Sequence, residues 1–344
     1  MYFIQVIERY SNCGAGILLS ADGLSGKESR RSGSGGMAML LADDWNDYEL
    51  IDAGGGEKLE RWGRYILRRP DPKAIWPVTG NGKAWKTVDA HYHRSSSGGG
   101  RWEYFTKLPA QWTVRYGEMQ FYVEPTGFKH TGLFPEQAVN WKWIEDKVRS
   151  AIRAEGAEDG SKGGREGKAP GRKISVLNLF AYTGGATVAA AHAGAGVCHV
   201  DASKGMVTRA KENLALSKLA DRPVRLIVDD VVKFVGREIR RGRKYDAVIM
   251  DPPSYGRGPN GELWKIEDNI FSLITMCMDV LTEKPLFFIV NSYTTGLSPT
   301  VIGNMLKISM QRKYGGSVTA DEIGLPASAA GLVLPCGATG RWEA

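Results

Sequence analysis

The second half of the chain alternates short apolar runs with segments of helical periodicity, and this alternation constrains the fold more than any other feature. The apolar runs predict strands at 174–179, 197–201, 224–228, 245–250 and 285–291. The other segments predict helices near 185–193, 203–218, 230–241, 266–282 and 298–313. Such alternation is typical of a parallel sheet covered by helices on both faces, and ligands bind these sheets beyond the carboxyl ends of the strands.

Two further apolar runs complete the predicted sheet. Residues 316–320 and 330–336 predict a hairpin at its edge. The sequence therefore predicts an α/β fold with a mostly parallel sheet of seven strands.

The first half of the chain has a different texture. Between Tyr48 and Glu124, short apolar runs are separated by Gly, Pro and Asp, and WTVRY and MQFYVE alternate with period 2 on either side of Gly117-Glu118, as in a β-hairpin. We expect residues 37–126 to form a small, mainly antiparallel β domain. Its core should contain most of the tryptophans of this half, the alternative for some being to stack on RNA. These residues are Trp45, Trp62, Trp76, Trp85, Trp102 and Trp112.

Two segments lack apolar periodicity. Residues 1–36 end in a stretch rich in Gly and Ser and predict a flexible N-terminal segment, and residues 155–173 hold no large apolar side chain and predict a flexible linker. Trp141–Arg153 has helical spacing of its apolar residues and predicts an amphipathic helix before that linker. The α/β domain is then expected to span residues 127–344.

Charge and cysteine content exclude several classes of protein. The 344 residues carry a formal net charge of +7, and no stretch approaches the ~20 apolar residues of a membrane span, so we expect a cytoplasmic protein with no membrane partner. His91 and His93 fall on a predicted loop with no third ligand, so no metal is expected. The cysteines share no C-x-x-C spacing, which argues against structural zinc, iron–sulfur or thioredoxin chemistry. They are Cys13, Cys198, Cys277 and Cys336.

A glycine turn follows the first strand of the predicted sheet. Thr183-Gly184-Gly185 lets the backbone turn tightly and approach a ligand. The G-x-G-x-x-G spacing of dinucleotide sites is absent, and Phe180 and Tyr182 stand where a pyrophosphate would need free amides. The loop therefore fits a ligand with an adenosine but no phosphate, the alternative being a turn required by packing alone.

Acidic residues end three of the predicted strands. Asp201 ends the second strand, Asp229-Asp230 the third and Asp251 the fourth. A carboxylate at the second position can accept hydrogen bonds from both ribose hydroxyls, and one at the third from an adenine amino group. An Asp after a strand is also a common helix N-cap. The conjunction with the glycine loop favours a ligand site.

The most specific motif is D-P-P-S-Y, which opens with Asp251. Because each proline restricts the backbone, the motif presents the Asp251 carboxylate and the Pro252 carbonyl as fixed acceptors. Tyr255 can stack on a planar substrate. This layout suits a nucleobase, held at its edge by hydrogen bonds and on its face by π contact. The alternative is a proline-rich turn after the strand with a structural role only. Asp251, Pro252 and Tyr255 are the candidate catalytic residues.

From about residue 128 onward the chain resembles the class I S-adenosylmethionine-dependent methyltransferases. It is more closely similar to the bacterial 23S ribosomal RNA methyltransferases that carry a D-P-P-x-aromatic motif. The matching segments, in order, are FKHTGLFPEQ, LFAYTGGATVAAA, HVDASKGMVTRAKENLALSKL, RLIVDDVVKFV and MDPPSY. The resemblance implies a Rossmann-like methyltransferase domain, S-adenosylmethionine as the cofactor and RNA, above all ribosomal RNA, as the partner.

The resemblance also implies which residues hold the cofactor. Asp201 and Ser203 would bind its ribose, and Asp230 its adenine. The residues around its methionine part would be Phe180, Ala181, Thr183 and Gly184, with Phe134 and Gln137 contributed by the preceding motif.

One departure from the resemblance bears on the atom that is methylated. Relatives that methylate cytosine C5 place a cysteine just beyond the fifth strand, because a thiolate must first add to C6. Here that segment reads NSYTTG, and Cys277 and Cys336 are expected to be buried. A base nitrogen, which needs only positioning and a hydrogen-bond acceptor, is therefore the predicted target. Methylation of DNA or of a protein nitrogen, or a catalytically silent RNA-binding protein, are the alternatives.

The distribution of charge weakens the argument from the net charge. The densest basic run, Lys233–Lys244, leads to the amino end of the fourth strand, opposite the predicted site, and is expected to be a solvated face. The small β domain is a candidate RNA-binding domain, because most basic residues predicted to contact RNA lie in it. They are Lys58, Arg61, Arg64, Arg68, Arg69, Arg257 and Lys265.

Overall fold

The computed structural model describes residues 39–79, 82–95, 99–160, 173–257, 263–294 and 296–344. Residues 37–344 form one compact unit. The predicted flexible segment 1–36, Cys13 and residues 161–172 of the predicted linker lie outside the described residues.

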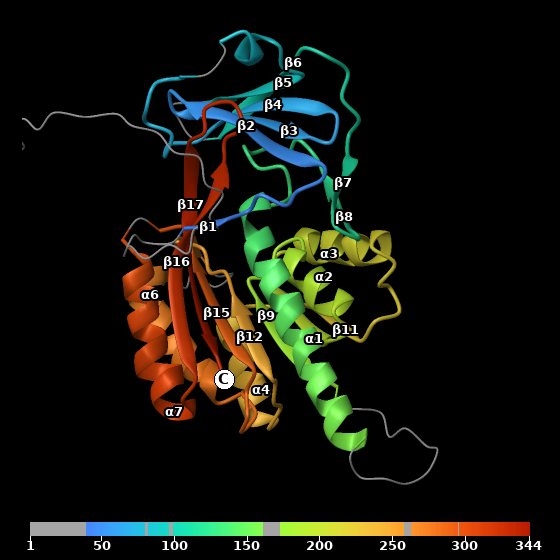
Figure 1. The fold of residues 1–344 in the computed structure, drawn as a ribbon, viewed down its shortest axis with the longest axis vertical. Helices are drawn as coiled ribbons and strands as arrows, with labels where there is room; N and C mark the ends of the chain where they lie inside the picture. The colour runs from blue at the N-terminus through green and yellow to red at the C-terminus, as the bar shows by residue number, and fades with distance from the viewer. Residues whose placement is uncertain (1–38, 80–81, 96–98, 161–172, 258–262, 295) are drawn as a thin grey trace, which may run out of the picture. The chain divides into compact units, whose positions relative to one another are not determined.

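A large sheet contains the predicted parallel strands (Figure 1). Its order is β1-β16-β17-β15-β12-β9-β10-β11. The five strands predicted from apolar runs are confirmed, pair in parallel and begin and end within two residues of the prediction. They are β9 (Ser175–Leu179), β10 (Gly196–Asp201), β11 (Val224–Val228), β12 (Ala247–Met250) and β15 (Phe287–Ser292).

The predicted edge hairpin is confirmed but is larger than expected. Its strands are β16 (Ser317–Pro326) and β17 (Val333–Glu343), and β17 lies antiparallel between β15 and β16. A short strand, β1 (Leu40–Leu41), pairs in parallel with β16. The sheet therefore has eight strands instead of seven, because a strand of two residues is too short to show a period.

Helices cover both faces of the large sheet (Figure 1). Side chains alternate along β9, so that Val176 joins a core with α1, α2 and α3 while Leu177 joins a core with α4, α5 and α6. The helices are α1 (Ala138–Gly160), α2 (Gly185–His192), α3 (Lys204–Leu216), α4 (Val231–Arg240), α5 (Ile266–Met278) and α6 (Pro299–Leu306). None of the helices in the described ranges is long and apolar enough to cross a membrane.

Two predicted helix boundaries differ from the structure. α1 continues through residues 155–160, which the sequence predicts as linker, since Glu155, Ala157 and Glu158 are helix formers. The helix predicted at 298–313 is α6 followed by a π-helical segment, η3 (Lys307–Gln311), and a last turn, α7 (Arg312–Tyr314).

A second sheet of five strands confirms the small, mainly antiparallel β region. Only β4 and β5 pair in parallel. Its strands are β2 (Tyr48–Gly54), β3 (Glu57–Trp62), β4 (Tyr65–Pro70), β5 (Ala90–Arg94) and β6 (Gly100–Tyr104). The predicted hairpin is β7 (Trp112–Tyr116) and β8 (Met119–Val123), joined through Gly117 at a φ of 56°.

The tryptophans of the first half are core residues, as predicted. Trp62 and Trp85 are buried, and the other four are partly buried against the core. That core is continuous with the one beneath α1: the rings of Trp45 and Trp141 are 5.8 Å apart, and Trp45 Nε1 donates to the carbonyl of Pro135 at 2.9 Å. The domain boundary at residues 126–127 stays a prediction.

A buried asparagine at the start of α1 joins three parts of the fold. Asn140 Nδ2 donates to Gln137 Oε1 at 2.8 Å and to Asn291 Oδ1 at 3.0 Å. Its Oδ1 accepts from Arg341 Nε at 2.9 Å and Nη2 at 2.7 Å. Asn140 thereby connects the short helix η2 (Pro135–Gln137), β15 and β17.

Replacing Asn140 by Leu should lower the free energy of unfolding by about 3 kcal/mol, because it removes the side-chain acceptor of the buried Arg341 guanidinium and the donor to Asn291 and Gln137. Urea unfolding measures the change. The matched control is Asn304→Leu, an exposed asparagine of α6, which should change stability by less than about 0.5 kcal/mol. Equal losses in the two variants would contradict this role of Asn140.

Candidate functional site

A cavity lies at the carboxyl ends of β9, β12 and β15. Asn178 and Asn291 contribute to its wall from β9 and β15. Six of the residues predicted from the sequence also line it: Phe134, Gln137, Phe180, Ala181, Thr183 and Asp251. The structure therefore brings together residues from before α1, after β9 and after β12.

The loop between β9 and α2 has an uncommon backbone. Phe180 and Tyr182 adopt φ values of 53° and 50°, in the left-handed region, and Gly184 adopts 86°. Such angles in large side chains are strained and persist where contacts hold them. Here Tyr182 N–H donates to Asp201 Oδ2 at 2.8 Å and Ala181 N–H donates to the Val200 carbonyl at 3.1 Å. Sequence reasoning expected a turn, but not these angles at two aromatic residues.

Gly184 is required by packing as well as by its backbone angle. It caps the start of α2 without lining the cavity, and a Cβ placed on it would lie 2.9 Å from the Cβ of Ala210 in α3. The packing alternative considered for this turn is therefore part of its explanation.

Asp201 has room for a ligand although it also holds the loop. Its Oδ2 accepts from Tyr182 N–H, and its Oδ1 accepts from Ser203 N–H at 2.8 Å. Each carboxylate oxygen has two lone pairs, so one per oxygen remains for a ribose hydroxyl. Ser203 caps α3, and both residues lie beside the cavity rather than in its wall.

Asp230 is a helix N-cap, which is the alternative that the sequence left open. Its Oδ1 accepts from Lys233 N–H at 2.9 Å at the start of α4. Asp229 forms an ion pair with Arg237, and its N–H donates to the carbonyl of Asp201 at 3.0 Å. The ends of β10 and β11 are thus adjacent, and Asp230 stays a predicted adenine ligand outside the cavity wall.

Asp251 has an acceptor that no group satisfies. Its Oδ1 is buried, and no hydrogen-bond partner for it exists among the described residues. Burial and the negative charge of Glu136 raise the pKa of Asp251 to about 7. Pro252 is buried beside it, and the turn is fixed by Trp264 Nε1, which donates to the carbonyl of Pro253 at 2.7 Å. Buried acceptors without a partner are uncommon in folded proteins, which makes Asp251 a candidate ligand-binding group.

Tyr255 does not line this cavity. It begins β13 (Tyr255–Arg257), which pairs with β14 (Leu263–Lys265), and its side chain is 53% exposed. The ring is available to a substrate that approaches from outside, but the structure does not bring it against Asp251.

Several residues in the cavity wall or next to it carry no prediction from the sequence, among them Asn291 in the wall and Glu136 and Tyr293 beside it. Gln137 Nε2 donates to the Tyr293 hydroxyl at 2.9 Å, and Asn291 Nδ2 donates to Gln137 Oε1 at 3.3 Å. Glu136 is buried, and burial raises its pKa. Asn291 could have been found, because it ends a predicted strand as Asp251 does. Glu136 and Tyr293 carried no such signal.

Aromatic rings connect these residues to the loop after β9. The ring of Phe134 lies 5.3 Å from that of Tyr182 and 5.7 Å from that of Tyr293. Phe134 was expected either to bind the cofactor or to be a core aromatic, and it occupies a position between the two: half-buried, with one side in the cavity.

The expectation that His91 and His93 lack a third ligand is wrong. Both lie on β5 rather than on a loop, and antiparallel pairing places Glu103 of β6 opposite His91. One ligand atom of each of these three residues lies within 4.8 Å of the others. His91 Nε2 is hydrogen-bonded to Glu57 and His93 Nε2 to Glu103, each at 2.7 Å.

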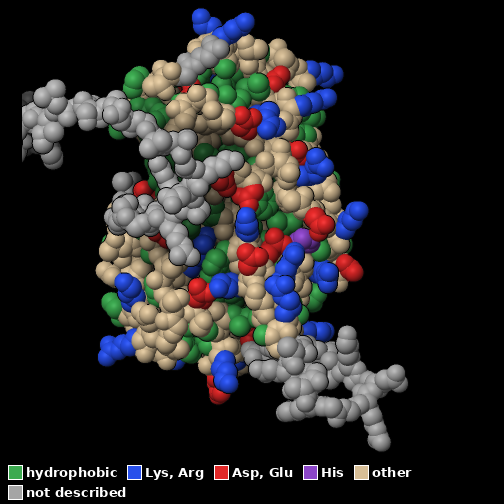
Figure 2. Space-filling view, in the orientation of Figure 1, with side chains coloured by type: hydrophobic (Ala, Val, Ile, Leu, Met, Phe, Trp, Pro, Cys, Tyr) green, Lys and Arg blue, Asp and Glu red, His purple; other side chains and the backbone are tan. Residues whose placement is uncertain are grey.

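Most basic residues predicted to contact RNA are paired with carboxylates. Arg61 pairs with Glu49 at 3.0 Å, and Arg68 pairs with Glu57. Arg69 is only 4% exposed and pairs with Glu60 at 2.6 Å, and its contact with RNA stays a prediction. On the face shown in Figure 2, Lys and Arg side chains are scattered among Asp and Glu and form no single basic patch.

Comparison with known proteins identifies the family of this chain. A family model described as "S-adenosylmethionine-dependent methyltransferase" matches residues 160–266. A crystal structure of a SAM-dependent methyltransferase from Agrobacterium tumefaciens is 33% identical, with a TM-score of 0.78 over 89% of this chain and 93% of that one. This chain belongs to the S-adenosylmethionine-dependent methyltransferases.

Curated relatives of this methyltransferase match it over shorter segments. Ribosomal RNA large subunit methyltransferase K/L of Shewanella frigidimarina is 32% identical over 157 residues, which is 45% of this chain. Ribosomal RNA large subunit methyltransferase I of an Enterobacter species is 40% identical over 81 residues, or 23% of this chain. The chain spans only 18% and 20% of the length of these two relatives.

The stability of the ligand-free methyltransferase should depend on pH through Asp251. Since the pKa is raised from 3.8 to about 7 on folding, the folded state holds the proton more tightly, and stability falls as the pH rises between these values. Relative to Asp251→Asn, the free energy of unfolding of the native protein should fall by up to about 4 kcal/mol across this window. Glu136 remains in both proteins, and parallel pH profiles in urea unfolding would contradict the assignment.

Proposed function

We propose that this methyltransferase transfers the methyl group of S-adenosylmethionine to a nitrogen of an RNA base, with ribosomal RNA as the substrate. The proposal rests on the carboxyl group of Asp251, the first residue of the D-P-P-S-Y motif. Its Oδ1 has no hydrogen-bond partner among the described residues, and it lines a cavity together with Phe134 and Gln137. The names of the curated relatives support ribosomal RNA as the acceptor. Such a substrate would place the enzyme in the cytoplasm.

The residues at the sheet edge fit the cofactor. Asp201 retains acceptor capacity for the ribose, since each of its carboxylate oxygens accepts one backbone hydrogen bond and can accept another. In the proposed arrangement Ser203 borders the ribose and Asp230 accepts from the adenine. The methionine part would lie against Phe134, Gln137, Phe180, Ala181 and Thr183.

The chemistry needs little from the protein beyond positioning. S-adenosylmethionine, when bound, supplies a methyl group on a sulfonium. Asp251 and the Pro252 carbonyl accept hydrogen bonds from the target nitrogen, which orients its lone pair and disperses the positive charge that develops on it. A carboxyl group with a pKa of about 7 can also take up the proton that the methylated nitrogen loses. Tyr255 covers the outer face of the base.

The cysteines of the described residues support a nitrogen target. None of them lines the Asp251 cavity. Cys277 is fully buried in α5, and burial raises its pKa beyond the range in which a thiolate forms at neutral pH. Cys336 lies on β17 with its Sγ 3.4 Å from the carbonyl of Leu334, and burial likewise raises its pKa. Cys336 lines the neighbouring cavity, but burial disfavours its thiolate as it does that of Cys277, so neither supplies a ready nucleophile for attack on cytosine C6.

Cofactor binding is tested with S-adenosylhomocysteine as the probe. At 100 times its Kd it should stabilise the protein by roughly 2.7 kcal/mol in thermal unfolding. Asp201→Asn should weaken the affinity about tenfold, because the carboxylate loses one acceptor oxygen. Asp221→Asn, an exposed aspartate before β11, is the control and should bind as the native protein does. Lack of any stabilisation would favour a silent RNA-binding protein.

The acceptor is tested with labelled S-adenosylmethionine on total RNA, DNA and protein. We expect label in RNA alone and a nitrogen-methylated base by mass spectrometry of the nucleosides. Tyr255→Ala should reduce transfer about tenfold or more through lost stacking while S-adenosylhomocysteine affinity is kept. Phe271→Ala, which removes an exposed ring of α5, is the control. Unlabelled RNA would refute the proposal, and label in DNA or protein would identify the alternative acceptor.

A further inference from the structure

A second cavity lies next to the Asp251 cavity and shares Leu133 and Phe134 with it. Its volume is about 350 Å³, within the range of sites for small organic ligands. One wall comes from the small sheet and the turn after β4, and the other from residues 129–136 with Tyr293 and Cys336. None of the residues predicted to bind the cofactor lines it except Phe134.

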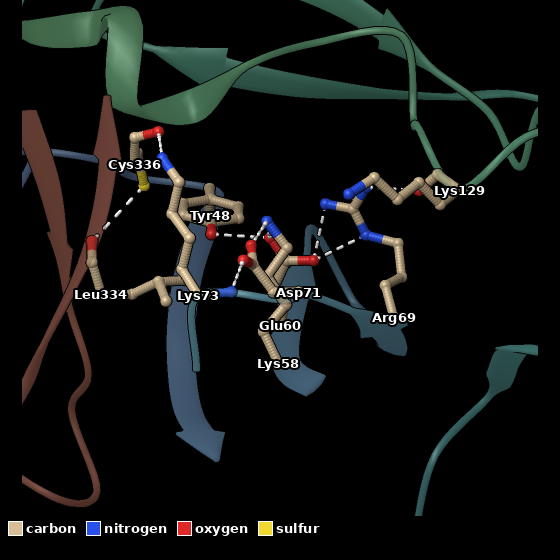
Figure 3. Close-up of polar contacts among 9 residues, drawn as sticks. All are labelled: Tyr48, Lys58, Glu60, Arg69, Asp71, Lys73, Lys129, Leu334 and Cys336. Carbon is tan, nitrogen blue, oxygen red and sulfur yellow. Dashed lines mark hydrogen bonds and ion pairs between the residues drawn. The ribbon is translucent and has the colours of Figure 1, made fainter. Parts of the chain in front are cut away.

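The wall from the small sheet carries a surplus of positive charge (Figure 3). Glu60 is fully buried and is neutralised by Arg69 at 2.6 Å and Lys58 at 3.4 Å, while the Tyr48 hydroxyl donates to it at 2.8 Å. Asp71 lies 3.4 Å from the same Lys58. Two carboxylates thus engage Lys58 and Arg69 and no further cation.

Two lysines at this cavity are left without a carboxylate among the described residues. Lys73 Nζ contacts only the backbone carbonyl of Cys336. Lys129 offers its own carbonyl to Arg69 Nη1 at 2.6 Å, but its ammonium group forms no ion pair there. Burial and the surrounding cations lower the pKa of Lys129, which a bound anion would reverse.

The same cations lower the pKa of a neighbouring histidine. His130 lines the cavity, and burial together with the charges of Arg69, Lys129 and Lys58 lowers its pKa to about 4. It is therefore neutral at pH 7 and adds no charge. Its ring lies 5.4 Å from that of Phe134, so a row of rings runs from the lysines toward the Asp251 cavity.

The opposite wall is suited to a planar polar group. Phe134 and Tyr293 present rings 5.7 Å apart, and Glu136 presents a buried carboxyl group. The charge of Glu136 raises the pKa of Asp251, so the two carboxyl groups lie close enough to interact. Rings that stack and carboxyl groups that accept from amino hydrogens are the features by which proteins hold an unstacked base.

We propose that this second cavity receives the target nucleotide of the RNA, with its phosphate bound by Lys73 and Lys129 and its base directed along Phe134 and Tyr293 toward Asp251. This inference rests on the proposed function and assigns its substrate site.

Isothermal titration of the full chain, saturated with S-adenosylhomocysteine, tests the site with the four ribonucleoside 5′-monophosphates and the matching nucleosides. At least one monophosphate should bind about tenfold more tightly than its nucleoside, and Lys73→Gln and Lys129→Gln should each remove most of that difference. Lys86→Gln, an exposed lysine of the short helix η1 (Ala84–Lys86), should not change it. Equal affinity for monophosphates and nucleosides, no binding of any monophosphate, or unchanged affinity in both variants would overturn the proposal.

Methylation kinetics separate this proposal from the proposed function. With RNA as substrate, Lys129→Gln should raise KM about tenfold with little change in kcat and in S-adenosylhomocysteine affinity. Transfer to RNA with an unchanged KM in both lysine variants would refute the phosphate site and leave the function standing. Failure to methylate any RNA, with the monophosphate preference intact, would refute the RNA acceptor and leave the site standing.

Discussion

The side chain of Asn140 holds the functional part of this molecule together. It is buried where α1 crosses the large sheet, and it satisfies both the guanidinium of Arg341 and the amide oxygen of Gln137. Because a buried charge without partners is costly, these hydrogen bonds stabilise α1 in its position against β15 and β17. That position sets Phe134 and Gln137, just before the helix, against the loop after β9.

The cavity that results combines strain with an unsatisfied acceptor. The left-handed backbone at Phe180 and Tyr182 is held by Asp201, one of the residues proposed to bind the cofactor. Asp251 remains buried without a partner for Oδ1. Both features cost stability in the free protein and are expected where a ligand is to be bound. The proposed cofactor and base would share this preorganised edge of the sheet.

The small sheet contributes to the site instead of standing beside it. Its hydrophobic core is continuous with that of α1 through Trp45 and Trp141, and its cations line the second cavity. The antiparallel strand β17 connects the turn after β4 to α1, since its Cys336 carbonyl accepts a hydrogen bond from Lys73 and its Arg341 donates to Asn140. The proposed nucleotide site therefore needs elements from across the whole described chain.

Local pattern alone determined the parallel strands, the Gly117 hairpin and the order of acids at the strand ends, because hydrophobic period and turn chemistry act over a few residues. It also identified Asp251 and the loop at Phe180 as parts of one site. Only the tertiary structure decided that Asp230 caps a helix, that Glu103 meets His91 and that Arg69 is buried on Glu60. It likewise decided that Glu136 and Tyr293 join the site. These outcomes depend on which distant residue supplies the partner for a charge or an amide, and no local period encodes that choice.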